Sequence, residues 1–84
     1  MDEYYMDVST AVRNRIRGLL HERNITVNKL GTICGIPQGT LKNMMGGRNG
    51  LTVITLKKIC DGLEITLVEF FDTDEFHALE QEIR

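Results

Sequence analysis

The sequence predicts an all-α fold of five helices, followed by a short C-terminal helical extension. Apolar residues recur every three or four positions along most of the chain, which is the period of a helix buried on one side. Threonines and glycines stand where these stretches begin and end, as helix caps require. No stretch keeps the alternation of a strand, since the β-prone residues 52–54 continue into a helical period. The 84 residues suffice for one domain, and we expect the helical domain at 8–71 and the extension at 72–84.

The first helix is predicted over about residues 9–23. Its apolar face consists of Val12, Ile16, Leu19 and Leu20. Arg13 and Arg17 flank this face on one side, and Arg15 flanks it on the other. Asn24 suits the left-handed conformation that ends a helix.

The second helix is predicted to follow Thr26, whose hydroxyl can cap the first turn. Ile25 and Leu30 stand at the positions of a hydrophobic staple around this start. Gly35 is expected to end the helix in the left-handed conformation. The residues of this helix that we expect to be buried are Leu30, Ile33 and Cys34.

The third helix is predicted over Gln38–Met45, and Pro37 suits its first position because proline has a preset φ and no N–H to satisfy. Ile36 is expected to fill the core beneath the turn. The inward side chains are expected to be Leu41, Met44 and Met45. The outward residues are expected to be Gln38, Gly39, Lys42 and Asn43. This outward face exposes amides and one lysine without an acid, so it is the candidate binding face.

The fourth helix is predicted to follow a turn-rich basic segment, residues 46–50, with Thr52 as its N-cap. Its buried stripe is expected to be Val53, Leu56, Ile59, Cys60 and Leu63. Burial of Cys60 and Cys34 is expected to leave two reduced thiols in the core.

The fifth helix is predicted to begin at a capping box formed by Thr66 and Glu69, and to end at about Phe71. Asp72 and Glu75 have the spacing to cap one further helix that reaches the C-terminus. The apolar side chains of this region are Phe70, Phe71, Phe76, Leu79 and Ile83. They either dock on their own domain or form a dimer seam, and the residues at 4–6 (Tyr4, Tyr5 and Met6) could cover the same patch.

The formal charge of -2 conceals an uneven distribution. Residues 1–7 carry -3, residues 8–58 carry +8, and residues 59–84 carry -7. The basic part indicates a surface that faces a polyanion, and the acidic part indicates a separate face. We therefore expect the extension to point away from a bound nucleic acid, because its acids would repel phosphate.

Composition and motifs argue against several other classes of protein. No apolar run approaches the roughly 18–20 residues of a membrane span, and the acidic N-terminus does not resemble a signal peptide, so we expect a cytoplasmic protein. Cys34 and Cys60 form no CxxC pair, and His21 and His77 lack metal-ligand spacing. No catalytic triad pattern occurs, and the segment 46–50 lacks the GK[ST] ending of a phosphate loop. We therefore predict no enzymatic activity, no cofactor and no metal.

Residues 26–45 have the spacing of a helix-turn-helix, with a first helix of about nine residues, a tight glycine-containing turn and a second short helix. Gly31 and Gly35 would let the two helices approach closely. The outer face of the second helix would then protrude, and a helix of this width fits the major groove of DNA.

Residues 12–71 resemble the Cro/CI-type, or lambda-repressor-like, helix-turn-helix domain. The matching residues are Ile16-Arg17-x-Leu19, Ile25-Thr26, Leu30, Ile33, Gly35-Ile36-Pro37-Gln38-Gly39-Thr40-Leu41, Gly47, Thr55-Leu56-x-Lys58-Ile59, Leu63 and Ile65-Thr66-Leu67-x-Glu69-Phe70-Phe71. The resemblance covers all five predicted helices.

The resemblance implies which residues contact DNA. Base reading falls to Gln38, Gly39, Asn43 and Lys42, the last at a position that touches backbone or flanking bases. Phosphate contacts fall to Thr26, Val27, Asn28, Thr40, Arg48, Asn49 and Thr52. Two of these positions depart from the family: Val27 stands where a glutamine is common, and Gly39 removes one side chain from the reading face.

The function implied is sequence-specific transcriptional regulation, most simply repression at a double-stranded DNA operator in a prokaryotic or phage setting. Related proteins often bind pseudo-palindromes as homodimers. Two alternatives stay open. One is an antitoxin-like autoregulator whose C-terminal extension binds a protein partner, and the other is an interaction module of the same fold that does not bind DNA.

Overall fold

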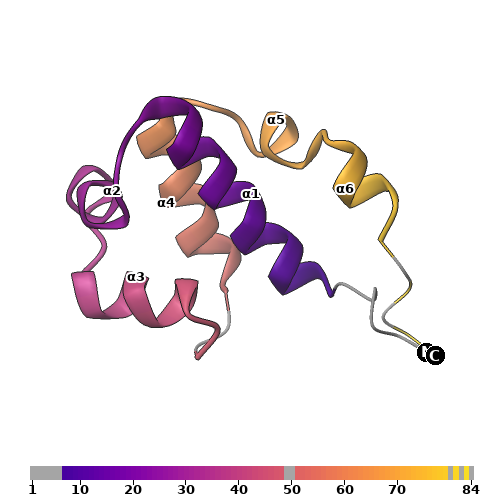
Figure 1. Cartoon of the computed structure of the whole chain (residues 1–84), viewed down its shortest axis with the longest axis horizontal. Coiled ribbons are helices and arrows are strands. Elements are labelled where there is room, and N and C mark those ends of the chain that lie inside the picture. Colours follow the sequence, from indigo (N-terminus) through magenta and orange to yellow (C-terminus); the bar gives the residue numbers. More distant parts are fainter. Residues whose placement is uncertain (1–6, 49–50, 80, 82, 84) are drawn as a thin grey trace.

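The computed structural model describes residues 7–48, 51–79, 81 and 83, and within them the chain is helical without strands, as predicted. The helices are α1 (Val8–Arg23), α2 (Val27–Cys34), α3 (Gln38–Met45), α4 (Val53–Leu63), α5 (Leu67–Phe71) and α6 (Asp74–His77). Helix α2 packs against α3 and α4, α5 contacts α4, and α6 contacts α1. Figure 1 shows α1 between two groups of helices, with α3 on one side and α5 and α6 on the other.

The predicted helix ends are found at most of the expected residues. The hydroxyl oxygens of Thr26 and Thr52 accept hydrogen bonds from the backbone N–H groups of the residues three positions on, at 3.1 and 3.0 Å. Asn24 and Gly35 adopt left-handed conformations with φ of 59° and 70°. Local chemistry therefore sets where α1 ends and where α2 and α4 begin.

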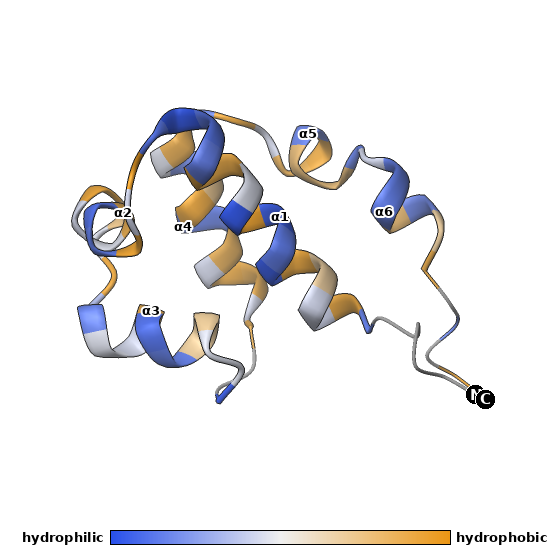
Figure 2. Ribbon diagram, in the orientation of Figure 1, coloured by the Kyte–Doolittle hydropathy of each residue, from blue (hydrophilic) through white to orange (hydrophobic). Residues whose placement is uncertain are grey.

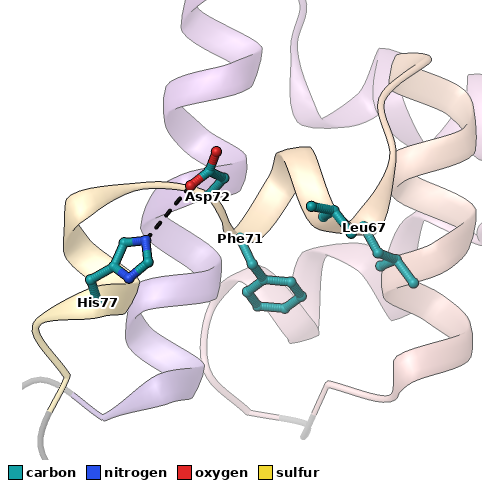
Figure 3. A pocket seen from close by; sticks show the side chains of 5 residues that line it. Leu67, Phe71, Asp72 and His77 are labelled. Atoms are coloured by element: carbon teal, nitrogen blue, oxygen red, sulfur yellow. Dashed lines mark ion pairs between the residues drawn. The ribbon is translucent and has the colours of Figure 1, made fainter.

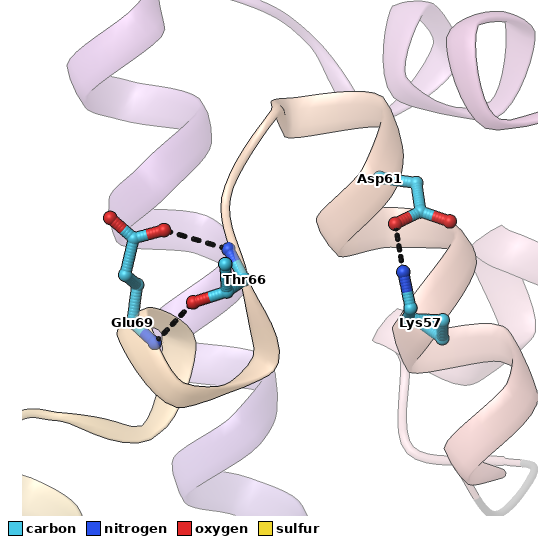
Figure 4. Close-up of polar contacts among 4 residues, drawn as sticks. All are labelled: Lys57, Asp61, Thr66 and Glu69. Carbon is cyan, nitrogen blue, oxygen red and sulfur yellow. Dashed lines mark hydrogen bonds and ion pairs between the residues drawn. The ribbon is translucent and has the colours of Figure 1, made fainter.

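The start of α5 is a complete capping box, as predicted. The Thr66 hydroxyl accepts a hydrogen bond from the Glu69 N–H at 3.0 Å, and the Glu69 carboxylate accepts one from the Thr66 N–H at 2.8 Å (Figure 4). Figure 4 also shows an ion pair on α4 between Lys57 and Asp61, one helical turn apart. The box orders the first turn of a helix that has only five residues.

The starts of α3 and α6 differ from those predicted from the sequence. Pro37 is the N-cap of α3, with φ of -55° and ψ of 140°, and lies one residue before the first helical position. Asp72 does not cap α6, because the Thr73 N–H donates to the Phe71 carbonyl at 2.9 Å and this turn makes Thr73 the N-cap. The predicted helix to the C-terminus is also wrong, since α6 ends at His77 and residues 79, 81 and 83 are not helical.

The core consists of side chains from α1 to α5 and from the turn between α2 and α3. Figure 2 shows hydrophobic and hydrophilic positions interleaved along α1 and α4, as amphipathic helices require. The buried apolar side chains are Ala11, Val12, Ile16, Leu19, Leu20, Leu30, Ile36, Leu41, Met44, Met45, Leu56, Ile59, Cys60, Leu63 and Phe70. Most of the predicted apolar faces are therefore correct.

Two residues predicted to be buried are exposed: Ile33 retains 43% of its accessible surface and Val53 retains 74%. In α2 the buried pair is Leu30 and Gly31, and successive residues turn by about 100°, so Ile33 points to the side of the buried arc. Val53 is the first residue of α4 and lies about one turn before Leu56, where the buried stripe of the helix begins. Cys34 is only partly buried.

The C-terminal region packs on the domain through its aromatic rings. The ring centroids of Phe70 and Phe76 lie 6.0 Å apart, and those of Phe71 and Phe76 lie 4.8 Å apart. Phe76 thus packs against the core, whereas Ile83 is 89% exposed and does not share its face. Tyr4, Tyr5 and Met6 lie outside the described residues.

Candidate nucleic-acid interface

Helix α3 presents a polar surface to solvent because its apolar side is used by the core. Leu41, Met44 and Met45 are buried. On the opposite side Gln38, Gly39, Thr40 and Lys42 are exposed, and Asn43 is partly buried. The exposed side carries hydrogen-bonding groups and one positive charge without an acid, so it can approach a polyanion and bind polar edges.

The side chain of Gln38 connects α3 to α2. Its amide Nε2 donates a hydrogen bond of 2.7 Å to the backbone carbonyl oxygen of Asn28. Gly31 makes room for this contact, since a Cβ at that position would lie 2.8 Å from Nε2 of Gln38. Asn28 and Gln38, which the sequence assigns to phosphate and base contacts respectively, are therefore neighbours.

Three helices begin near the polar surface with N–H groups that have no acceptor within the helix. Thr26, Val27 and Asn28 lie at the start of α2, and Thr52 lies before α4. The N-cap of α3 is a proline without a side-chain hydrogen bond. Because helix N-termini carry partial positive charge, these ends are suited to phosphate groups.

A surface hollow of about 420 Å³ follows the end of α3. Lys42, Asn43, Gly46 and Arg48 line it. The N–H of Arg48 donates to the carbonyl of Asn43 at 2.9 Å, so the backbone of the loop turns back toward α3. Lys42 and Arg48 thus place two positive charges on the same hollow, while Asn49 lies outside the described residues.

The arginines of α1 have structural roles that the sequence analysis missed. Arg17 donates to the carbonyl of Met45 at 2.7 Å, at the end of α3. Arg15 donates to the carbonyls of Phe70 and Glu69 at 2.8 and 3.1 Å, at the end of α5. The predicted placement of these two arginines on opposite flanks of α1 is the signal that could have indicated these contacts. Part of the +8 charge of residues 8–58 therefore serves the fold.

Other surface features lie away from α3. An apolar hollow of about 530 Å³ is lined by Leu67, Val68, Phe71, Asp72 and His77 of the α5–α6 region. Figure 3 shows these lining side chains, with a dashed line between Asp72 and His77, whose Oδ1 and Nε2 atoms lie 3.6 Å apart. Burial raises the pKa of the Cys34 and Cys60 thiols, and the nearby Asp61 carboxylate adds to the rise. Both cysteines are free, and a raised pKa favours the protonated thiol over the thiolate.

Within the part of the chain that the structure describes, His, Cys, Asp and Glu side chains form no group of three that could hold a metal ion. None of the helices described is both long and apolar enough to cross a lipid bilayer.

Comparison with known proteins identifies one family. The model of the Cro/C1-type helix-turn-helix DNA-binding domain matches residues 15–75. A solved structure described as that of the prophage Lp1 protein 11 is similar, with a TM-score of 0.76 and 28% sequence identity over 87% of this chain and 97% of that chain. No curated protein sequence matches the chain.

Proposed function

The chain belongs to the Cro/C1-type helix-turn-helix DNA-binding domain family, and we propose that it is a sequence-specific transcriptional regulator, most simply a repressor that occupies an operator. Residues 8–71 would bind the DNA, and residues 72–84 would form an extension directed away from it. The observation that carries the proposal is the outward face of α3, which is polar and free of acids while the core holds its other side.

In this proposal α3 enters the major groove. Gln38 and Asn43 carry amides that can pair with the N6 and N7 positions of adenine, and Lys42 can donate to guanine or to phosphate. Gly39 contributes backbone alone, so it lets α3 approach the bases closely without a side chain of its own.

The phosphate contacts come from groups around this helix. The N-termini of α2 and α4, at Val27, Asn28 and Thr52, would direct N–H groups at the DNA backbone. Thr26 and Thr40 add hydroxyls at the starts of α2 and α3. Arg48, together with Asn49, would clamp the backbone at the far end of α3.

Selection of bound sites from random duplex tests the proposal most directly. The expected result is an enriched motif in which adenines face the Gln38 and Asn43 amides. If the protein binds as a homodimer, the motif is expected as two half-sites about one helical turn, ~34 Å, apart. A single asymmetric site would remove the dimer from the proposal. Absence of duplex binding at low salt would favour the interaction module instead.

Variants then separate base reading from phosphate contact. Lys42→Ala and Arg48→Ala are expected to weaken binding to all duplexes and each to lower the salt-dependence slope by about 1. Gln38→Ala and Asn43→Ala are expected to relax sequence preference while keeping that slope. An unchanged motif in both amide variants would show that other residues read the bases.

A further inference from the structure

The Gln38 amide is held in one orientation by the backbone of α2. Its Nε2 donates to the Asn28 carbonyl oxygen at 2.7 Å. A carbonyl oxygen only accepts hydrogen bonds, so the nitrogen must face it and Oε1 must point elsewhere. Rotating the amide by half a turn would replace this hydrogen bond with two oxygens facing one another.

Gly31 provides the space in which this orientation exists. It is buried in α2, and a Cβ there would lie 2.8 Å from Nε2 of Gln38 and 3.1 Å from the carbonyl oxygen of Ile36. A Cβ at residue 31 would therefore push the Gln38 amide away from Asn28. Gly31 thus affects the orientation of the Gln38 amide on the outer face of α3.

The held amide still offers Oε1 and its second N–H. This pair matches adenine, which presents the N6 amino donor beside the N7 acceptor in the major groove. Guanine presents two acceptors, O6 and N7, and Oε1 would face one of them. A freely rotating glutamine lacks this bias, because it can turn its nitrogen toward guanine.

We propose that Gly31 and the Asn28 carbonyl are positioning elements that make Gln38 select adenine over guanine. The proposal rests on the proposed function, in which α3 lies in the major groove. It assigns Gly31 a role in sequence preference, in addition to its role in helix packing.

The experiment compares binding to the selected site and to duplexes in which each A·T pair is changed to G·C. Wild type is expected to discriminate roughly 5- to 100-fold at one adenine. Gln38→Ala and Gly31→Ala are each expected to reduce that ratio to within about threefold of unity. In the Gln38→Ala background, Gly31→Ala is expected to have no further effect on the ratio, because it acts through Gln38.

Two further tests separate this role from folding. Gly18→Ala is the matched control, since nothing lies within 4 Å of a Cβ there, and it is expected to keep the wild-type ratio. In wild type, NMR is expected to show that the Gln38 side-chain amide, which donates to the Asn28 carbonyl, exchanges its hydrogens with solvent more slowly than the amide of the exposed Gln81. If Gly31→Ala does not fold, as circular dichroism would reveal, this comparison decides.

The possible failures are distinguishable. If wild type binds no duplex at low salt, the proposed function fails and this inference fails with it. If Gln38→Ala abolishes the adenine preference while folded Gly31→Ala keeps it, only the inference is overturned. The same holds if the Gln38 and Gln81 amides exchange equally fast, or if the base that depends on Gln38 is guanine.

Discussion

At the scale of single residues, two arginines of α1 complete the ends of other helices. The last carbonyls of a helix lack partners within the helix and carry partial negative charge. Arg17 donates to one at the end of α3, and Arg15 donates to two at the end of α5 while its guanidinium lies 5.8 Å from the Phe70 ring centre. These long-range bonds join α1 to both groups of helices.

Arg15→Ala is expected to lower the free energy of unfolding by about 1–3 kcal/mol, because the hydrogen bonds from a charged donor to the Phe70 and Glu69 carbonyls are lost. Chemical denaturation measures the change. Arg23→Ala, at an exposed position of the same helix, is the control and is expected to cost less. Equal effects of the two substitutions would mean that the contacts of Arg15 contribute no stability.

Asp7 makes the stability of α1 depend on pH. Its carboxylate accepts a hydrogen bond from the Thr10 N–H at 2.8 Å, and hydrogen bonding to Thr10 lowers the pKa of Asp7 below 3.8. A lowered pKa in the folded state stabilises the protein above the unfolded-state pKa, and this stabilisation is lost as pH falls through the folded-state pKa. Asp7→Asn should therefore destabilise the protein most at neutral pH.

Thermal melts of wild type and Asp7→Asn between about pH 2.5 and 7 test this prediction. The difference in Tm is expected to shrink as the pH falls below the ordinary value of 3.8 and through the lowered pKa of the folded Asp7 carboxyl. A difference that stays constant over this range would contradict the role of the charge.

At the scale of elements, α5 depends on its first turn. A helix of five residues is too short to be stable alone, yet it carries Phe70, which is fully buried. The capping box at Thr66 and Glu69 and the donation from Arg15 secure its two ends. Short helices such as α5 keep their place through contacts at both termini.

Thr66→Ala is expected to lower the free energy of unfolding by about 1 kcal/mol, since an unpaired N–H then remains at the start of α5. Thr66→Ser retains the hydroxyl and is expected to stay closer to wild type. Urea unfolding of the three proteins measures the order, and a Ser variant as unstable as the Ala variant would argue against the cap.

At the scale of the whole molecule, the basic residues near α3 and the acidic residues of α6 lie on different sides of α1. Helix α3 and its basic neighbours are on one side, and α6, which begins with Asp74 and Glu75, contacts α1 on the other (Figure 1). Salt screens exposed charges over the Debye length, about 10 Å at 0.1 M. We therefore expect acids that lie across α1 from α3 to have little influence on binding at α3.

The double substitution Asp74→Asn and Glu75→Gln tests this orientation. It removes two negative charges and is expected to change the Kd for the selected duplex less than about threefold at 0.1 M salt. Lys42→Gln, which removes one positive charge, is expected to weaken binding more and to lower the salt slope by about 1. A large gain in affinity from the double substitution would place the extension near the DNA.

The sequence by itself determined the elements that depend on neighbouring residues. Five of the six helices, the hydroxyl caps at Thr26, Thr52 and Thr66, and the left-handed ends at Asn24 and Gly35 follow from local hydrogen bonding and side-chain period. The family followed from the same local patterns, because its core and turn positions recur at fixed spacing.

Only the tertiary structure decided which of several amphipathic arcs is buried and which polar groups meet across the fold. Ile33 and Val53 have the correct period for burial, yet Ile33 lies beside the buried arc of α2 and Val53 lies in the first turn of α4, so both stay exposed. The bonds of Arg15 to α5 and of Gln38 to Asn28 join residues 55 and 10 positions apart. Such contacts depend on how the helices are placed in space, and the spacing of apolar residues along the chain does not specify that placement.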